Sequence, residues 1–251
     1  MIEYFFIAGA QRCGTTYLYH LLEQHPEIDM ARPVAPEPKF FLIDNLYVKG
    51  LDYYKKKFFA DATGARVRGE KSTSYIEHEK TAERIAKSFP SARVLFVLRD
   101  PILRAISNYR FSVQNGYETL GIEEAFRQES RRRADYDPAK VSVSPFSYLQ
   151  RGKYIDYLEP YVSHFPADRV KIVLYEELTS SPENLRDIYR FLRVDPLFQP
   201  VADYASQNTG SGPRIMISAS LQSYMREFFR DPNDRLRRFL GRPIEAWTDW
   251  E

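Results

Sequence analysis

A glycine-containing turn follows the first apolar segment of the chain. Residues 9–16, Gly-Ala-Gln-Arg-Cys-Gly-Thr-Thr, have the GxxxxG-T-T spacing of a phosphate loop, with Thr15 where a Walker loop carries lysine. Glycines let the backbone turn tightly, the N–H groups at the start of a following helix converge on an anion, and the hydroxyls of Thr15 and Thr16 add donors. The loop's positive charge lies on Arg12 instead. The sequence therefore predicts an anion-binding loop and argues against ordinary nucleoside triphosphate hydrolysis.

A second candidate site for an anion follows the apolar run Arg93–Leu98. Arg99-Asp100-Pro101 comes directly after this run, and Ser107 lies about two turns into the helical pattern that follows. Pro101 suits the first turn of a helix. Because open α/β sheets bind ligands at the carboxyl ends of their strands, Arg99 and Ser107 could hold a further phosphate. The alternative is a surface pair of Arg99 with Asp100 and an ordinary helix serine.

The elements that must position these residues are visible in the hydrophobic pattern. Three runs are apolar almost throughout, as is typical of parallel strands covered on both faces: Tyr4–Ala8, Arg93–Leu98 and Val170–Tyr175. Helical patterns alternate with them, over Thr15–His25, Thr81–Ser88, Ile102–Gln114, Ile122–Arg132, Tyr148–His164 and Pro182–Leu192. The proline-rich stretch Arg32–Pro38 predicts a loop. The fold class expected is α/β, a P-loop-like doubly wound sheet of mainly parallel strands flanked by helices.

Composition narrows the class of protein further. The 251 residues carry 36 Lys plus Arg against 34 Asp plus Glu, a net charge of +2 that lacks the basic excess of a dedicated nucleic-acid binder. Cys13 is the one cysteine, which rules out an intrachain disulfide and a zinc site built from cysteines. No run approaches the roughly 20 apolar residues of a membrane span, and the start lacks a basic region followed by a long apolar one. We expect a cytoplasmic protein with no membrane span, no nucleic-acid partner and one domain over residues 1–251.

The two anion-binding segments together resemble the sulfotransferase family, which uses 3′-phosphoadenosine 5′-phosphosulfate (PAPS). Residues 9–16 are similar to the family's 5′-phosphosulfate loop, GxxKSGTT or GxxRSGTT, with cysteine where serine or glycine is usual. Residues 99–109 are similar to its 3′-phosphate element, RDPxxRxxSxY. The resemblance implies PAPS as donor and adenosine 3′,5′-bisphosphate (PAP) as product. The donor-binding residues that it implies are Arg12, Cys13, Gly14, Thr15, Thr16, Arg99 and Ser107.

Further matches run along nearly the whole chain. Glu37-Pro38-Lys39-Phe40-Phe41 resembles the K-E-x-x-F-F segment of carbohydrate-type sulfotransferases, whose glutamate is the presumed base. Residues 69–75, Gly-Glu-Lys-Ser-Thr-Ser-Tyr, resemble their GEKTPxY. Residues 208–214 resemble the late loop that closes over the adenosine and the 3′-phosphate, which implies a donor-binding role for Arg214. The order of these matches, continuing to Trp247, supports a single domain.

Sulfuryl transfer needs a base for the acceptor hydroxyl and stabilisation of the departing phosphate oxygen. Arg12 and the loop N–H groups suit the second task, and Glu37 is the predicted base, with His78 as the reserve candidate. The resemblance places Lys71 beside the sulfate and the acceptor, and Glu70 is expected to orient Lys71. No metal is required.

The acceptor is predicted only as a class. The glutamate-type motif favours a hydroxyl on a carbohydrate or glycoconjugate, and a hydroxyl on a polyketide, a carrier-bound acyl chain, a lipid or another natural product stays open. Two other protein classes share the phosphate loop: a P-loop kinase, which the missing lysine argues against, and a non-catalytic nucleotide-binding protein. The sequence makes no prediction of oligomeric state.

Overall fold

The computed structural model describes residues 2–132, 134–137, 142–201 and 216–247. The chain divides into two compact units. The first comprises residues 1–98 and 158–210, and the second comprises residues 99–157 and 211–251. Each unit is described by itself below, and the single domain over residues 1–251 stays a prediction.

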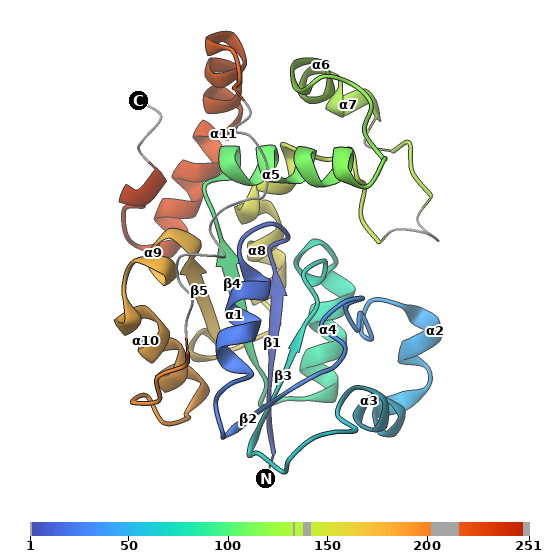
Figure 1. The fold of residues 1–251 in the computed structure, drawn as a ribbon, viewed down its shortest axis with the longest axis vertical. Helices are drawn as coiled ribbons and strands as arrows, with labels where there is room; N and C mark the ends of the chain where they lie inside the picture. The colour runs from blue at the N-terminus through green and yellow to red at the C-terminus, as the bar shows by residue number, and fades with distance from the viewer. Residues whose placement is uncertain (1, 133, 138–141, 202–215, 248–251) are drawn as a thin grey trace. The chain divides into compact units, whose positions relative to one another are not determined.

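The first unit holds a five-stranded sheet in the order β2-β3-β1-β4-β5, and every neighbouring pair is parallel. The strands are β1 (Glu3–Gly9), β2 (Ile28–Met30), β3 (Val67–Lys71), β4 (Arg93–Leu98) and β5 (Val170–Leu174). Figure 1 shows α1 in front of the central strands, α9 and α10 on the β5 side, and α2, α3 and α4 on the opposite side. A parallel sheet flanked by helices confirms the predicted α/β fold class.

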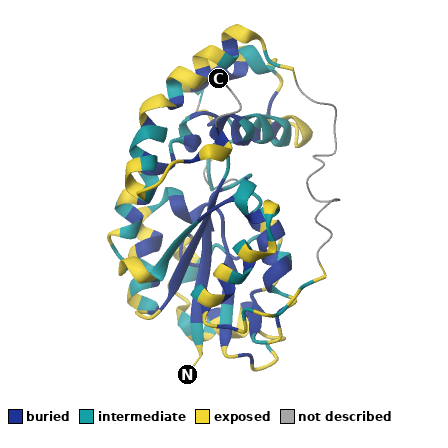
Figure 2. Cartoon of the chain, turned by 90° about the vertical axis from the view of Figure 1, so that its left-hand side faces the viewer, coloured by how far each residue is buried: buried dark blue, intermediate teal, exposed yellow. Residues whose placement is uncertain are grey.

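The sequence pattern predicts some of these strands and misses others. All six residues of β4 and six of the seven of β1 are buried, as an apolar strand covered on both faces should be, and Figure 2 shows these strands as buried. β2 and β3 escape prediction because β2 has only three residues and β3, Val-Arg-Gly-Glu-Lys, is mostly polar. Gly69 permits β3 to pack, since a Cβ there would lie 2.2 Å from Cζ of Phe5.

The helices of the first unit connect its strands or, for α9 and α10, follow the last strand. They are α1 (Thr15–Leu22), α2 (Asp44–Tyr47), α3 (Gly50–Phe58), α4 (Glu79–Ser88), α9 (Tyr175–Ser180) and α10 (Pro182–Leu192), with short 3₁₀ turns η1 (Tyr75–Glu77) and η3 (Ala167–Arg169). Tyr175, expected as the last residue of a strand, begins α9 instead. The proline-rich stretch 32–38 forms no helix or strand, as predicted.

Aromatic rings fill the core beside β1. Phe41 makes edge-on contacts with Phe6, Tyr54 and Phe89, with ring centroids 5.4, 5.4 and 6.1 Å apart. Such ring pairs stabilise a core beyond the area that they bury. Phe41 follows the proline-rich loop by three residues, so the core holds one end of the segment that carries Glu37.

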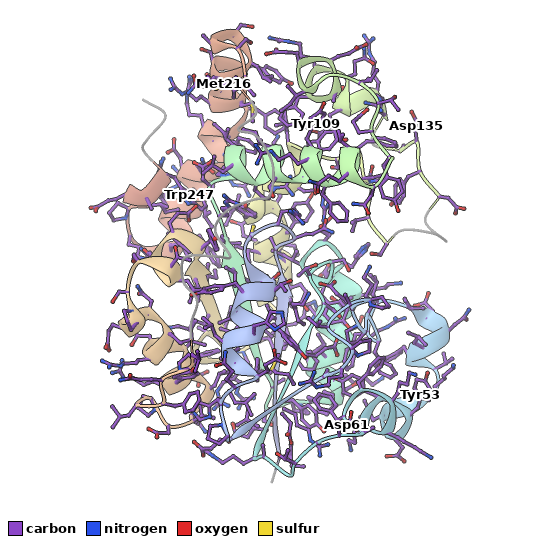
Figure 3. All side chains as sticks on the ribbon, viewed as in Figure 1. Tyr53, Asp61, Tyr109, Asp135, Met216 and Trp247 are labelled. Atoms are coloured by element: carbon purple, nitrogen blue, oxygen red, sulfur yellow. The ribbon has the colours of Figure 1, made fainter. Side chains whose placement is uncertain are left out.

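The second unit is helical. It contains α5 (Pro101–Gln114), α6 (Ile122–Arg127), α7 (Glu129–Arg132), α11 (Ala219–Leu240), η2 (Gln150–Gly152) and η4 (Glu245–Trp247); α8 (Tyr154–Val162) begins here and ends in the first unit. Its core includes Ile102, Ala105, Phe126, Tyr148, Leu221, Met225 and Phe229. Figure 3 labels Tyr109 on α5 and the buried Trp247 on η4. No helix in the described ranges has the length and apolar character needed to cross a membrane.

Two predicted helices of this unit are wrong in their bounds. The pattern over 122–132 is two short helices that are interrupted at Gln128, and Glu129 in the second accepts from the backbone N–H groups of Leu149 and Gln150. The helix predicted from Tyr148 begins only at Tyr154. The same two hydrogen bonds hold the backbone at 149–150 outside a regular helix.

Candidate functional site

The phosphate loop connects β1 to α1. Arg12 and Gly14 both adopt left-handed backbone conformations, with φ of 69° and 81°, and Gly14 is the residue that precedes the helix. No side chain in the described part of the chain caps this helix start. Because the first N–H groups of a helix lack partners within it, the turn presents backbone donors to an anion.

Both glycines of the loop are required by close packing. A Cβ at Gly9 would lie 2.6 Å from Cγ2 of Ile76, and a Cβ at Gly14 would lie 2.2 Å from the ring of Tyr175. Tyr175 begins α9 directly after β5, so its ring lies against the loop from the next element of the same unit. The spacing GxxxxG is therefore imposed by neighbouring side chains as well as by backbone conformation.

The other predicted donor-binding residues of the loop differ in exposure. Arg12 is half-buried, Thr15 is buried and Thr16 is exposed at the helix start. Cys13 is fully buried, and its Sγ lies 3.7 Å from the carbonyl oxygen of Gln11. The roles of these residues in holding the donor stay predictions.

Glu37 lies in a cluster of donors from the end of β3. Its Oε1 accepts from Nζ of Lys71 at 2.7 Å, and its Oε2 accepts from the backbone N–H of Thr73 at 2.9 Å. The hydroxyl of Thr73 lies 3.0 and 3.1 Å from the two carboxylate oxygens. The side chains of Lys71 and Glu37 are only 6% and 16% exposed, so this ion pair is shielded from water. Charge-assisted bonds of this kind hold a carboxylate in one orientation.

The Glu37 cluster and the phosphate loop begin at neighbouring strands. Lys71 ends β3 and pairs with Ile7 of β1, and the N–H of Ser72 donates to the carbonyl of Ile7 at 3.1 Å. Only Ala8 lies between Ile7 and Gly9, where the loop starts. Parallel strands share one carboxyl edge, which is where α/β sheets bind ligands.

Thr73 is the member of this cluster that sequence analysis missed. It stands where the GEKTPxY motif has proline, and a proline has neither an N–H nor a hydroxyl to donate. Thr73 supplies both to Glu37. A hydroxyl residue in place of that proline, close behind Lys71, is the signal that could have identified it.

Glu70 does not have the role expected for it. Adjacent residues of a strand point to opposite faces, so Glu70 and Lys71 diverge. The carboxylate of Glu70 accepts instead from the hydroxyls of Tyr54, Ser72 and Tyr75. Burial raises the pKa of Glu70 to about 7, and the three hydroxyl donors offset only part of that effect.

Arg99 and Ser107 belong to the second unit. Arg99 follows β4 directly, and its carbonyl accepts from the hydroxyl of Tyr154 at 2.8 Å. The carboxylate of Asp100 caps α5 by accepting from the N–H groups of Ile102 and Leu103 at 2.8 and 2.9 Å. Ser107 lies half-buried on α5. The roles of Arg99 and Ser107 stay predictions, and Arg214 lies outside the described residues.

The reserve base His78 lies between η1 and α4, where its carbonyl accepts from Thr81. Within the described ranges, no group of three His, Cys, Asp or Glu side chains is placed to hold a metal ion. The choice of Glu37 over His78 and the metal-independent reaction both stay predictions.

Comparison with known proteins places these features in a family. The sulfotransferase domain family matches residues 3–233. The crystal structure of a sulfotransferase from Alicyclobacillus acidocaldarius covers 97% of this chain and 97% of its own, with a TM-score of 0.80 and 30% identity. A sulfotransferase domain from the Synechococcus PCC 7002 olefin synthase covers 97% of this chain and 95% of its own, with a TM-score of 0.52 and 18% identity, a likeness of fold alone.

Curated relatives agree. Heparan sulfate glucosamine 3-O-sulfotransferase 3B1 of Mus musculus is 31% identical over 206 residues, which cover 81% of this chain. A bifunctional heparan sulfate N-deacetylase/N-sulfotransferase of Drosophila melanogaster is 28% identical over 217 residues, 80% of this chain and 20% of its own. The chain spans about half the length of the first of these, 49%. With the family match over residues 3–233 and this level of identity, the chain belongs to the sulfotransferase domain family.

Proposed function

We propose that the protein transfers the sulfuryl group of PAPS to an acceptor hydroxyl on a carbohydrate or glycoconjugate and releases PAP. The observation that carries the proposal is the Glu37 cluster: a shielded, oriented carboxylate at the end of β3, beside the strand that leads into a phosphate loop. A carboxylate held in one orientation beside a donor loop can act as a general base, which is the role that we propose for Glu37.

The donor side of the reaction falls to the phosphate loop. The backbone N–H groups at the start of α1, with the hydroxyls of Thr15 and Thr16, suit the 5′-phosphosulfate, and Arg12 suits the negative charge that develops on the departing phosphate oxygen. Donors aimed in advance at developing charge each supply a factor of about 10²–10³ in rate. We assign Arg99 and Ser107 to the 3′-phosphate, as the resemblance implies.

On the acceptor side, Glu37 takes the proton of the attacking hydroxyl. The acceptor oxygen forms a bond to sulfur as the bond from sulfur to the 5′-phosphate oxygen breaks, and the leaving phosphate keeps that electron pair. Once Glu37 is protonated, its attraction for Lys71 falls, which leaves the ammonium able to face the sulfuryl oxygens. Thr73 keeps the carboxylate aimed throughout.

The relatives support the acceptor class that we propose. The 31% identity with a heparan sulfate glucosamine sulfotransferase favours a sugar hydroxyl on an acidic polysaccharide. The test is transfer of ³⁵S from labelled PAPS to N-sulfated heparan polysaccharide, to a carrier-bound hydroxyacyl chain and to a hydroxylated lipid. We expect label in the polysaccharide. Label in another acceptor alone would overturn the acceptor class, and no transfer to any of them would count against the activity. Cytoplasmic location stays a prediction.

A further inference from the structure

Glu70 lies at the centre of a fully buried hydrogen-bond cluster. Its Oε1 lies 2.7 Å from the hydroxyl of Ser72 and 2.6 Å from that of Tyr75. Its Oε2 lies 2.7 Å from the hydroxyl of Tyr54. Glu70, Ser72 and the two tyrosines are each at most 1% exposed, so no bulk water competes with these bonds.

Two of these hydroxyls also hold the segment that carries Glu37. The backbone N–H of Lys39 donates to Oγ of Ser72 at 2.9 Å, and the N–H of Phe41 donates to the hydroxyl of Tyr75 at 3.1 Å. A backbone N–H can only donate, so both hydroxyls accept there. Each hydroxyl then donates its single proton to Glu70. We call these two paths, from Lys39 through Ser72 to Glu70 and from Phe41 through Tyr75 to Glu70, the two arms. The donor and the acceptor of each bond in them are thereby fixed.

The backbone between Glu37 and Phe41 needs such support. Lys39 has a φ of 49°, a left-handed conformation that a residue with a side chain adopts at a cost. This left-handed residue lies between Glu37 and Phe41, and the ring of Phe41 is buried in the core. The hydroxyls of Ser72 and Tyr75 accept from the N–H of Lys39 itself and from the N–H of Phe41, two residues further along.

We propose that Glu70 is a positioning residue that sets the orientation of Glu37 through Ser72 and Tyr75. This inference rests on the proposed function in one respect, the assignment of Glu37 as the base. Glu70 touches neither donor nor acceptor in this account. Its carboxylate orders two hydroxyls, and those hydroxyls order the backbone beside the base.

The third hydroxyl provides a matched control. Tyr54 donates to Glu70 but receives no hydrogen bond from the segment 37–41 in the described structure. Glutamine at position 70 can also replace the acid: its carbonyl oxygen accepts from Ser72 and Tyr75, and its amide donates to the hydroxyl of Tyr54. Leucine at position 70 can do neither.

Amide hydrogen exchange, read by NMR on the full chain with PAP present, tests the arms without an acceptor. We expect Tyr75→Phe to speed exchange at the N–H of Phe41 by about tenfold, and Ser72→Ala to do the same at Lys39, because each loses its acceptor. Tyr54→Phe should leave both amides within about twofold. Equal effects from all three variants, or no effect from any, would overturn the proposal.

Kinetics of ³⁵S transfer from PAPS to N-sulfated heparan polysaccharide provide the second test. We expect Glu70→Leu and Tyr75→Phe to lower kcat by about tenfold or more with the KM for PAPS little changed, and Glu70→Gln to restore kcat. Loss of kcat in Glu70→Gln as severe as in Glu70→Leu would overturn the positioning role. If Glu37→Gln keeps full turnover, the proposed base fails, while the exchange data still decide whether Glu70 orders the segment.

Discussion

The phosphate loop and the segment that carries Glu37 begin at neighbouring strands but are built in different ways. The loop takes its shape from left-handed backbone at positions 12 and 14 and from glycines at positions 9 and 14, where neighbouring side chains leave no room for a Cβ. The segment 37–41 takes its shape from side chains more than 30 residues away along the chain, on and after β3. We therefore expect an added Cβ at Gly9 or Gly14 to disrupt the loop. We expect the loss of a hydroxyl from Ser72, Thr73 or Tyr75 to disrupt the segment 37–41.

This difference agrees with the separate tasks that we propose for the two regions. A loop made of backbone donors can bind an anion of fixed charge and needs no titrating group. A carboxylate held by an ammonium, an N–H and a hydroxyl can accept a proton and return to its orientation. We therefore expect variants of the loop to change donor affinity and variants of the segment to change turnover.

Glu37→Gln should show the largest effect. Removal of a general base lowers turnover by about 10²–10⁴, while affinity for PAP, measured by calorimetry, should stay within about twofold. Glu183→Gln on α10, another acid in an ion pair, is the control for loss of a paired carboxylate. Unchanged turnover in Glu37→Gln would remove Glu37 as the base and return His78 to consideration.

The next effect is on stability and comes from Glu70. Burial raises its pKa to about 7 from an ordinary value of 4.5, and the nearby charge of Glu37 adds to the rise. The folded protein therefore retains a proton that the unfolded chain loses, so this contribution is complete below pH 4.5 and declines as pH rises to about 7. At about 1.4 kcal/mol per unit, the loss is about 3 kcal/mol.

Urea unfolding of the wild type and of Glu70→Gln at several pH values measures this contribution. The difference in unfolding free energy between the two proteins should shift against the wild type from pH 4.5 to pH 7.5, because glutamine does not titrate. The hydroxyls of Tyr54, Ser72 and Tyr75 face this position in both proteins. A difference that is constant with pH would show that Glu70 does not titrate in this range.

Gly14→Ala addresses the backbone-built loop. Alanine there must hold a φ of 81° and place its Cβ within 2.2 Å of the ring of Tyr175, so we expect PAP affinity to fall by about 10–100-fold. Gly64→Ala is the matched control, since Gly64 has a φ of 91° with nothing within 4 Å of the added atom. Equal PAP affinity in the two variants would show that contact with Tyr175 does not shape the loop.

Thr73 gives the smallest and most graded effect. Thr73→Val removes the hydroxyl and keeps the N–H, so kcat should fall by about three- to tenfold; Thr73→Pro removes both donors and should cost more. Thr73→Ser keeps both donors and serves as control. Affinity for PAP should not follow this series, and a parallel fall in affinity would contradict the separation of tasks.

Sequence patterns predict β4 and the phosphate loop well. β4 has the bounds expected from its apolar run, and the loop lies between β1 and α1 as its glycine spacing indicates. β3 has no apolar run to identify it, because Arg68, Glu70 and Lys71 interrupt the apolar pattern of a strand. The polar residues that the site draws from β3 are therefore the reason that the strand escapes prediction.

The hydrogen bonds that hold the segment 37–41 cannot be predicted from local sequence patterns. Glu37 and Thr73 are 36 residues apart in the sequence. The pairing of β3 with β1 brings Thr73 to the carboxyl edge of the sheet, close to Glu37. Resemblance to a family supplied Glu37 and Lys71. It could not supply Thr73, because the family's motif has proline there, or the Glu70 cluster, whose bonds depend on tertiary packing.

The claim that this chain uses PAPS is tested most directly by calorimetric titration of the wild-type protein with PAP and, separately, with ATP and Mg²⁺. The 3′-phosphate is the group that distinguishes the PAPS-derived nucleotide from ATP. We predict clear binding of PAP and at least tenfold weaker binding of ATP, roughly 1.4 kcal/mol in binding free energy. Tight binding of ATP with weak binding of PAP would contradict the account and favour a P-loop kinase.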